Sequence, residues 1–66
     1  MLININGKPE EVEIKLNLVE LILAKGLSVE RVVIEHNLRI VPKEEWIDTR
    51  LQENDKVEIV SFVGGG

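Results

Sequence analysis

Residues 2–26 read LININGKPEEVEIKLNLVELILAKG, and the spacing of the apolar residues changes partway along this stretch. Leu2 to Asn6 alternates apolar and polar residues, which predicts a half-buried strand. Asn6-Gly7 supplies the positive φ angles that a tight hairpin turn needs. Val12 to Leu16 alternates again, so we expect a β-hairpin whose second strand spans residues 12–16.

From Asn17 the pattern takes the period of a helix. Asn17 is suited to cap the first backbone N–H groups, and Glu20 stands where a capping box has its acidic residue. Three apolar residues then fall on one helical face: Leu18, Leu21 and Ile22. Gly26 suits the left-handed conformation just past a helix end, so we expect one helix of about two to three turns, packed on the sheet.

The rest of the chain predicts three more strands. Short apolar runs at Val32–Ile34 and Leu38–Val41 predict two of them, and Pro42 ends the second because proline cannot donate to a sheet ladder. Lys43–Trp46 is expected to form a single helical turn. Lys56–Val63, KVEIVSFV, alternates and predicts a long last strand.

Strong strands at both ends of the chain, with one helix between them, favour a single α+β domain. The simplest compact arrangement is a mixed four- to five-stranded sheet, with the first and last strands adjacent and one main helix packed on one face. Nine Val, eight Ile and eight Leu, against one Phe and one Trp, predict an aliphatic core. We place the domain at residues 1–63 and a flexible C-terminal glycine tail at residues 64–66.

Composition excludes several classes of protein. No cysteine is present, which excludes a disulfide scaffold, a thiolate zinc site and a cysteine nucleophile. The net charge is −4 and the basic residues are scattered, which argues against nucleic-acid binding. No stretch approaches the ~20 apolar residues of a membrane span, and the N-terminus lacks the basic start of a signal peptide. We therefore expect a cytoplasmic protein that binds no membrane.

The sequence contains no self-contained active site. His36 is the only histidine, and we interpret it as an ordinary turn or strand residue. Adjacent Glu44 and Glu45 do not face each other on a helical turn, so we interpret them as a solvated face. Trp46 is interpreted as cover for one end of the core, with a partner contact as the alternative. These patterns predict neither an enzyme nor a metal site.

The last strand carries a candidate contact surface. If Val57 and Ile59 face the helix, alternation places Glu58, Val60 and Phe62 on the opposite, open face of the sheet. Exposed apolar groups on a small domain usually mark contact sites, so we expect Val60 and Phe62 to bind a partner. The alternative is that a loop covers them.

The candidate reactive group is the carboxylate of the glycine tail. Gly64, Gly65 and Gly66 follow the last strand directly and end the sequence. Three extended residues reach only ~10 Å, and glycine has no side chain to block a narrow channel. We expect the tail to thread the Gly66 carboxylate into the active site of a neighbouring protein. The alternative is a frayed end without function.

Three segments together resemble one family. They are LININGK at residues 2–8, NLRIVPKEEW at residues 37–46 and DKVEIVSFVGGG at residues 55–66. On these segments the whole chain resembles the ThiS family, the sulfur carrier proteins of thiamin thiazole biosynthesis, which are ubiquitin-like β-grasp proteins. It departs from the family at Lys43, where arginine is common.

The resemblance implies a sulfur carrier that binds no cofactor of its own and is not an enzyme. An adenylating, E1-like enzyme would use ATP and magnesium to activate the Gly66 carboxylate as an acyl-adenylate. Sulfur from a persulfide, such as that of a cysteine desulfurase, would then replace the adenylate and leave a C-terminal thiocarboxylate. Thiazole synthase would take that sulfur into the thiazole ring.

Three other functions share the same features. The small subunit of molybdopterin synthase is a sulfur carrier with a similar fold and tail, although it is usually longer and lacks the IVP…W segment. A ubiquitin-like modifier would instead form isopeptide bonds with lysines of target proteins. A plain interaction domain would have an inert tail.

Overall fold

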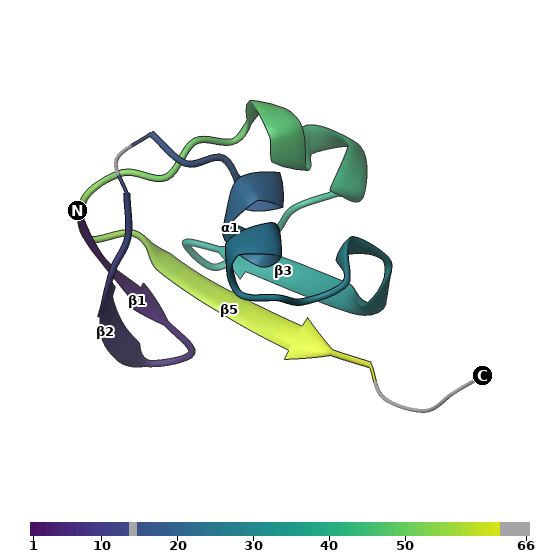
Figure 1. Cartoon of the computed structure of the whole chain (residues 1–66), viewed down its shortest axis with the longest axis horizontal. Helices are drawn as coiled ribbons and strands as arrows, with labels where there is room; N and C mark the ends of the chain where they lie inside the picture. Colours follow the sequence, from purple (N-terminus) through teal and green to yellow (C-terminus); the bar gives the residue numbers. More distant parts are fainter. Residues whose placement is uncertain (14, 63–66) are drawn as a thin grey trace.

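The computed structural model describes residues 1–13 and 15–62, and in this part of the chain five strands form one sheet with a short helix on one face (Figure 1). The strand order is β2-β1-β5-β3-β4. β1 and β5 run parallel, and the other neighbouring strands run antiparallel. The predicted mixed sheet, with adjacent first and last strands and one main helix, is confirmed.

β1 (Leu2–Ile5) and β2 (Lys8–Glu11) form the opening hairpin. The prediction that the second strand spans residues 12–16 is wrong. The turn contains only Asn6 and Gly7, with φ angles of 53° and 82°, so pairing resumes at the next residue. The four residues of β1 are therefore matched by the four that follow the turn.

Two residues of the hairpin show how it fits the sheet. Pro9 lies inside β2, opposite Asn4, and is tolerated because β2 is an edge strand and needs ladder bonds on one side only. The side-chain Oδ1 of Asn6 accepts a hydrogen bond from the N–H of Ile59 at 2.8 Å. Asn6 thus continues the contact between β1 and β5 past the end of β1.

The helix α1 (Leu18–Ala24) begins and ends as predicted. Asn17 Oδ1 accepts from the Glu20 N–H at 2.8 Å, and Glu20 Oε1 accepts from the Asn17 N–H at 2.9 Å, which completes the capping box. Gly26 has φ 72°, the left-handed conformation expected there. The predicted helical face is buried in the core: Leu18, Leu21 and Ile22.

The later elements occur near their predicted positions. A 3₁₀ turn η1 (Val29–Arg31) leads into β3 (Val32–His36), and β4 (Arg39–Ile40) follows a tight turn. The predicted helical turn is a longer 3₁₀ segment, η2 (Lys43–Asp48). β5 (Lys56–Ser61) is the longest strand, in agreement with the sequence pattern.

The described residues end at Phe62, one residue after β5. The predicted strand reached Val63, which lies outside the described residues, as do the glycines 64–66 and the expected domain boundary before them. Among the described residues, no helix is both long and apolar enough to cross a membrane.

The core lies between the sheet and the layer formed by α1 and η2. Its largest member, Trp46, is 1% exposed, and its Nε1–H donates to the Val41 carbonyl at 2.9 Å. The interpretation of Trp46 as a core residue is confirmed. The buried apolar residues are mostly aliphatic, as the composition predicted: Ile3, Ile5, Leu18, Leu21, Ile22, Val32, Ile34, Val41, Trp46, Leu51, Val57 and Ile59.

Candidate functional site

Successive side chains of β5 point to opposite faces of the sheet. Val57 is fully buried and Ile59 is 9% exposed on the side of α1. On the open face, Val60 is 56% exposed and Phe62 is 60% exposed. The predicted exposure of Val60 and Phe62 is confirmed, and at these exposures no described loop covers them.

The end of β5 is held firmly on β3. Ser61 pairs with Val32, and the N–H of Phe62 donates to the Arg31 carbonyl at 2.7 Å. The backbone is therefore hydrogen-bonded up to Phe62, the last residue described. Gly64, Gly65 and Gly66, the predicted reactive tail, lie outside the described residues.

The sheet register adds two residues of β3 to this face. Val33 lies opposite Val60, which widens the apolar surface near the end of β5. We call Val33, Val60 and Phe62 the apolar patch. Further along, Glu35 lies opposite Glu58, and like charges directly opposite each other repel. A cationic group of a partner would relieve that repulsion, so this face suits a surface that is apolar and basic.

The sequence pattern placed Glu58 on this face with Val60 and Phe62, but it did not indicate Val33 or Glu35. Alternation along β5 shows which of its own residues share a face. The neighbours across the sheet depend on the register between β3 and β5, and the sequences of two strands with nineteen residues between them do not indicate that register.

His36 belongs to a structural cluster and not to the candidate site. Its Nε2 lies 2.7 Å from Oδ2 of Asp55, and Asn37 Nδ2 donates to Asp55 Oδ1 at 3.1 Å. Burial opposes ionisation of Asp55, but the hydrogen bonds from His36, the Gln52 N–H and Asn37 outweigh it, so the pKa of this carboxyl is lowered. The cluster fixes the turn between β3 and β4 against the start of β5.

The other polar groups singled out from the sequence are spread over the surface. Glu44 and Glu45 are exposed on η2, and Glu45 Oε1 accepts from Arg39 Nη2 at 3.0 Å. Lys43 lies over the ring of Trp46, with Nζ 5.8 Å from the centroid. Over residues 1–13 and 15–62, no three His, Asp or Glu side chains are grouped so as to hold a metal ion.

Comparisons with known proteins agree on one family. The model of the ThiS family matches residues 3–66. The crystal structure of the thiamine biosynthesis protein ThiS from Geobacter metallireducens superposes with a TM-score of 0.86 at 35% identity, covering 100% of both chains. The sulfur carrier protein ThiS of Bacillus subtilis is 33% identical over 66 residues, which cover 98% of this chain and 100% of that protein. The predicted ubiquitin-like β-grasp fold is thereby confirmed.

A thiazole synthase from Magnetococcus marinus is also similar. It is 36% identical over 66 residues, which cover 100% of this chain and 20% of that protein. The chain therefore spans only a fifth of the length of this relative.

Proposed function

The chain belongs to the ThiS family, and we propose that it carries sulfur as a thiocarboxylate on Gly66. As a member of the family it is a sulfur carrier protein and not an enzyme in its own right. The observation that carries the finer proposal is the position of Val60 and Phe62, which are exposed at the end of a strand fixed by hydrogen bonds and stand shortly before the glycines in sequence.

The chemistry requires activation of the Gly66 carboxylate. An adenylating, E1-like partner uses ATP and magnesium to form the acyl-adenylate and releases pyrophosphate. A persulfide, such as that of a cysteine desulfurase, attacks the carbonyl carbon with its terminal sulfur, and AMP leaves. A thiol then cleaves the resulting acyl disulfide, which leaves the thiocarboxylate on Gly66 and a disulfide on the donor side. In this proposal the adenylating partner binds ATP and magnesium, and the chain supplies the carboxylate of Gly66.

The glycines and the apolar patch have separate tasks in this proposal. Gly64 and Gly65 allow the terminal group to enter a narrow active site because they carry no side chains. Ordering such a segment costs conformational entropy, which contacts of the folded domain must offset. Val60 and Phe62 are suited to supply those contacts because they are exposed, apolar and close to the tail.

Thiazole synthase is the proposed acceptor of the sulfur. A protein named thiazole synthase contains a segment similar to this whole chain, which supports a direct working relation between carrier and synthase. Physical proximity of the two would raise the effective concentration of the thiocarboxylate at the synthase active site.

The test removes the reactive group while keeping the domain. A chain lacking Gly66, and a chain with a peptide appended after Gly66, are expected to unfold at the same denaturant concentration as the unmodified protein. Both are expected to support no thiazole formation in a reaction that contains the adenylating enzyme, ATP, magnesium, a persulfide source and thiazole synthase. Normal thiazole formation with the appended chain would overturn the proposal, and lysine-linked adducts on other proteins would indicate a modifier.

A further inference from the structure

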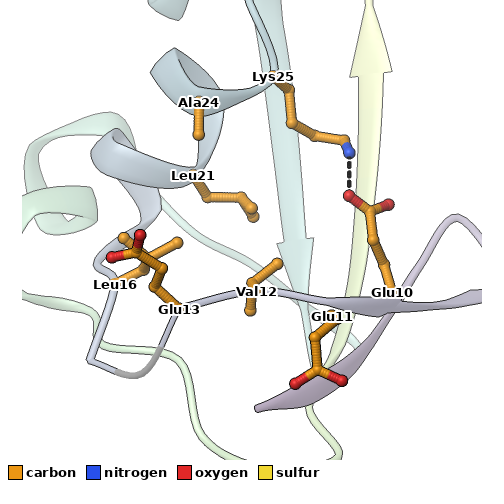
Figure 2. Close-up of a pocket in the computed structure, with 8 residues that line it drawn as sticks. All are labelled: Glu10, Glu11, Val12, Glu13, Leu16, Leu21, Ala24 and Lys25. Carbon is orange, nitrogen blue, oxygen red and sulfur yellow. Dashed lines mark hydrogen bonds and ion pairs between the residues drawn. The ribbon is translucent and has the colours of Figure 1, made fainter.

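A cleft of about 390 Å³ opens between β2 and α1, on the side of the sheet opposite the apolar patch. Its inner wall is apolar. Figure 2 shows the side chain of Leu21 directed toward Val12, with Ala24 one turn further along the helix and Leu16 at the other end. Such a wall favours an apolar side chain over water.

The outer edge of β2 leaves the backbone of Glu11 without a partner among the described residues. Leu2 lies opposite Glu11, but its N–H donates to Glu53 Oε2 at 3.1 Å and its carbonyl accepts from the Asn54 N–H at 2.8 Å. Leu2 therefore uses its backbone groups on the side away from β2. At such a position of an antiparallel pair, the N–H and C=O of Glu11 point outward from the sheet.

The side chains along this edge carry negative charge. Glu10 forms an ion pair with Lys25, while Glu13 is exposed and takes part in none of the described ion pairs (Figure 2). With Glu11, which is paired with the N-terminal ammonium group of Met1 at 2.7 Å, the rim of the cleft holds three carboxylates beside two ammonium groups, so one carboxylate is left uncompensated. The uncompensated carboxylate of Glu13 gives the rim a net negative charge, which favours an added strand that brings a cation to it.

We propose that the cleft and the free edge of β2 bind an extended, arginine- or lysine-rich segment of a partner protein by strand addition. The N–H and C=O of Glu11 pair with the backbone of this segment, its apolar side chains enter the cleft, and its cations face the carboxylates of the rim. Because the apolar patch lies on the other face of the sheet, this segment binds while the tail is engaged elsewhere. The site is thus additional to the sulfur carrier function.

The test is a titration of the isotopically labelled full chain with the peptide acetyl-Arg-Val-Arg-Val-Arg-amide, followed by NMR. Saturable shifts are expected at the amides of Glu11, Val12 and Ala24, together with slower hydrogen exchange of the Glu11 amide. The affinity is expected to fall as salt is added. Two control peptides separate the contribution of charge from that of backbone hydrogen bonds. One has Glu in place of Arg, and the other has every internal amide N-methylated.

Variants locate the site and separate it from the sulfur carrier function. Glu13→Lys is expected to weaken peptide binding about threefold to tenfold, whereas Glu44→Lys, the same charge change on η2, leaves it unchanged. A chain lacking Gly66 is expected to bind the peptide as the full chain does. Equal binding of the N-methylated peptide, equal binding of the Glu peptide, or the absence of saturable shifts along β2 would each overturn the proposal.

Discussion

Asn17 sets the start of α1 through a single side chain. Its Oδ1 and the carboxylate of Glu20 satisfy two backbone donors that the helix itself cannot pair, and Asn17 is buried as it does so. The Asn and Glu three residues apart were visible in the sequence, which is why the helix start was predicted correctly.

Replacing Asn17 tests this cap. Asn17→Ala is expected to lower the free energy of unfolding by about 1 kcal/mol because the Glu20 N–H loses its acceptor. Asn17→Ser, which keeps an acceptor oxygen, is the matched control and is expected to retain most of the stability. Denaturant unfolding followed by Trp46 fluorescence measures both, and equal losses in the two variants would contradict the role of the cap.

Asp55 makes the free energy of unfolding depend on pH in the acid range. Its pKa is lowered in the folded state, so the folded chain binds fewer protons there than the unfolded chain. The stabilisation from ionised Asp55 is therefore complete above pH about 4 and is lost as the pH falls through the lowered pKa. Asp55→Asn is expected to destabilise the chain at neutral pH, by an amount that shrinks as the pH falls below about 4.

Unfolding curves between neutral and acid pH measure that dependence. Asp48→Asn, which changes an exposed carboxylate on η2, is the control and is expected to leave the pH dependence unchanged. A destabilisation by Asp55→Asn that stays constant over the whole pH range would contradict the assignment. The sequence did not indicate this cluster, because His36 and Asp55 are nineteen positions apart and only the fold brings them to 2.7 Å.

At the scale of the elements, the opening hairpin depends on its turn. Gly7 has φ 82°, a conformation that an L side chain adopts only with strain. Nothing lies within 4 Å of a Cβ added there, so the cost of substitution comes from the backbone and not from a clash. The Asn-Gly pair was enough to predict the turn type.

Substitution at Gly7 separates backbone strain from contact effects. Gly7→Ala is expected to lower the free energy of unfolding by about 1 kcal/mol. D-alanine at the same position, introduced by chemical synthesis, favours positive φ and is expected to leave stability equal or higher. Equal losses with both alanines in denaturant unfolding would contradict the backbone explanation.

The strand after this turn shows where sequence patterns are insufficient. The alternation at residues 12–16 is as regular as that of a strand, yet β2 occupies the charged stretch Lys8–Glu11. Turn length determined the register, and the edge position of β2 let charged residues and Pro9 form a strand with little apolar content. Alternation predicts strands that have a buried face, and β2 lacks one for most of its length.

At the scale of the whole molecule, the sheet separates a helix-covered face from an open face that carries the apolar patch (Figure 1). The sequence predicted the exposure of Val60 and Phe62 because they alternate with the buried residues of their own strand. It did not predict their neighbours on β3, which depend on the pairing of the two strands. The use of the open face for docking stays a prediction.

Phe62→Asp tests that docking. The variant is expected to bind the adenylating enzyme about tenfold more weakly, with little loss of stability because Phe62 is 60% exposed. Leu23→Asp is the matched control, since Leu23 is 61% exposed on the helix layer, away from the patch. Calorimetric titration measures both affinities. Equal weakening by the two variants would contradict the claim that the apolar patch contacts the adenylating enzyme.

The most direct test of the sulfur carrier proposal is the intact mass of the protein after reaction. The chain is incubated with the adenylating enzyme, ATP, magnesium and a persulfide source, and is then fragmented to locate any change. We expect a mass gain equal to the replacement of one oxygen by one sulfur, located on Gly66. An unchanged mass, with an adenylating enzyme that is active on another carrier, would contradict it.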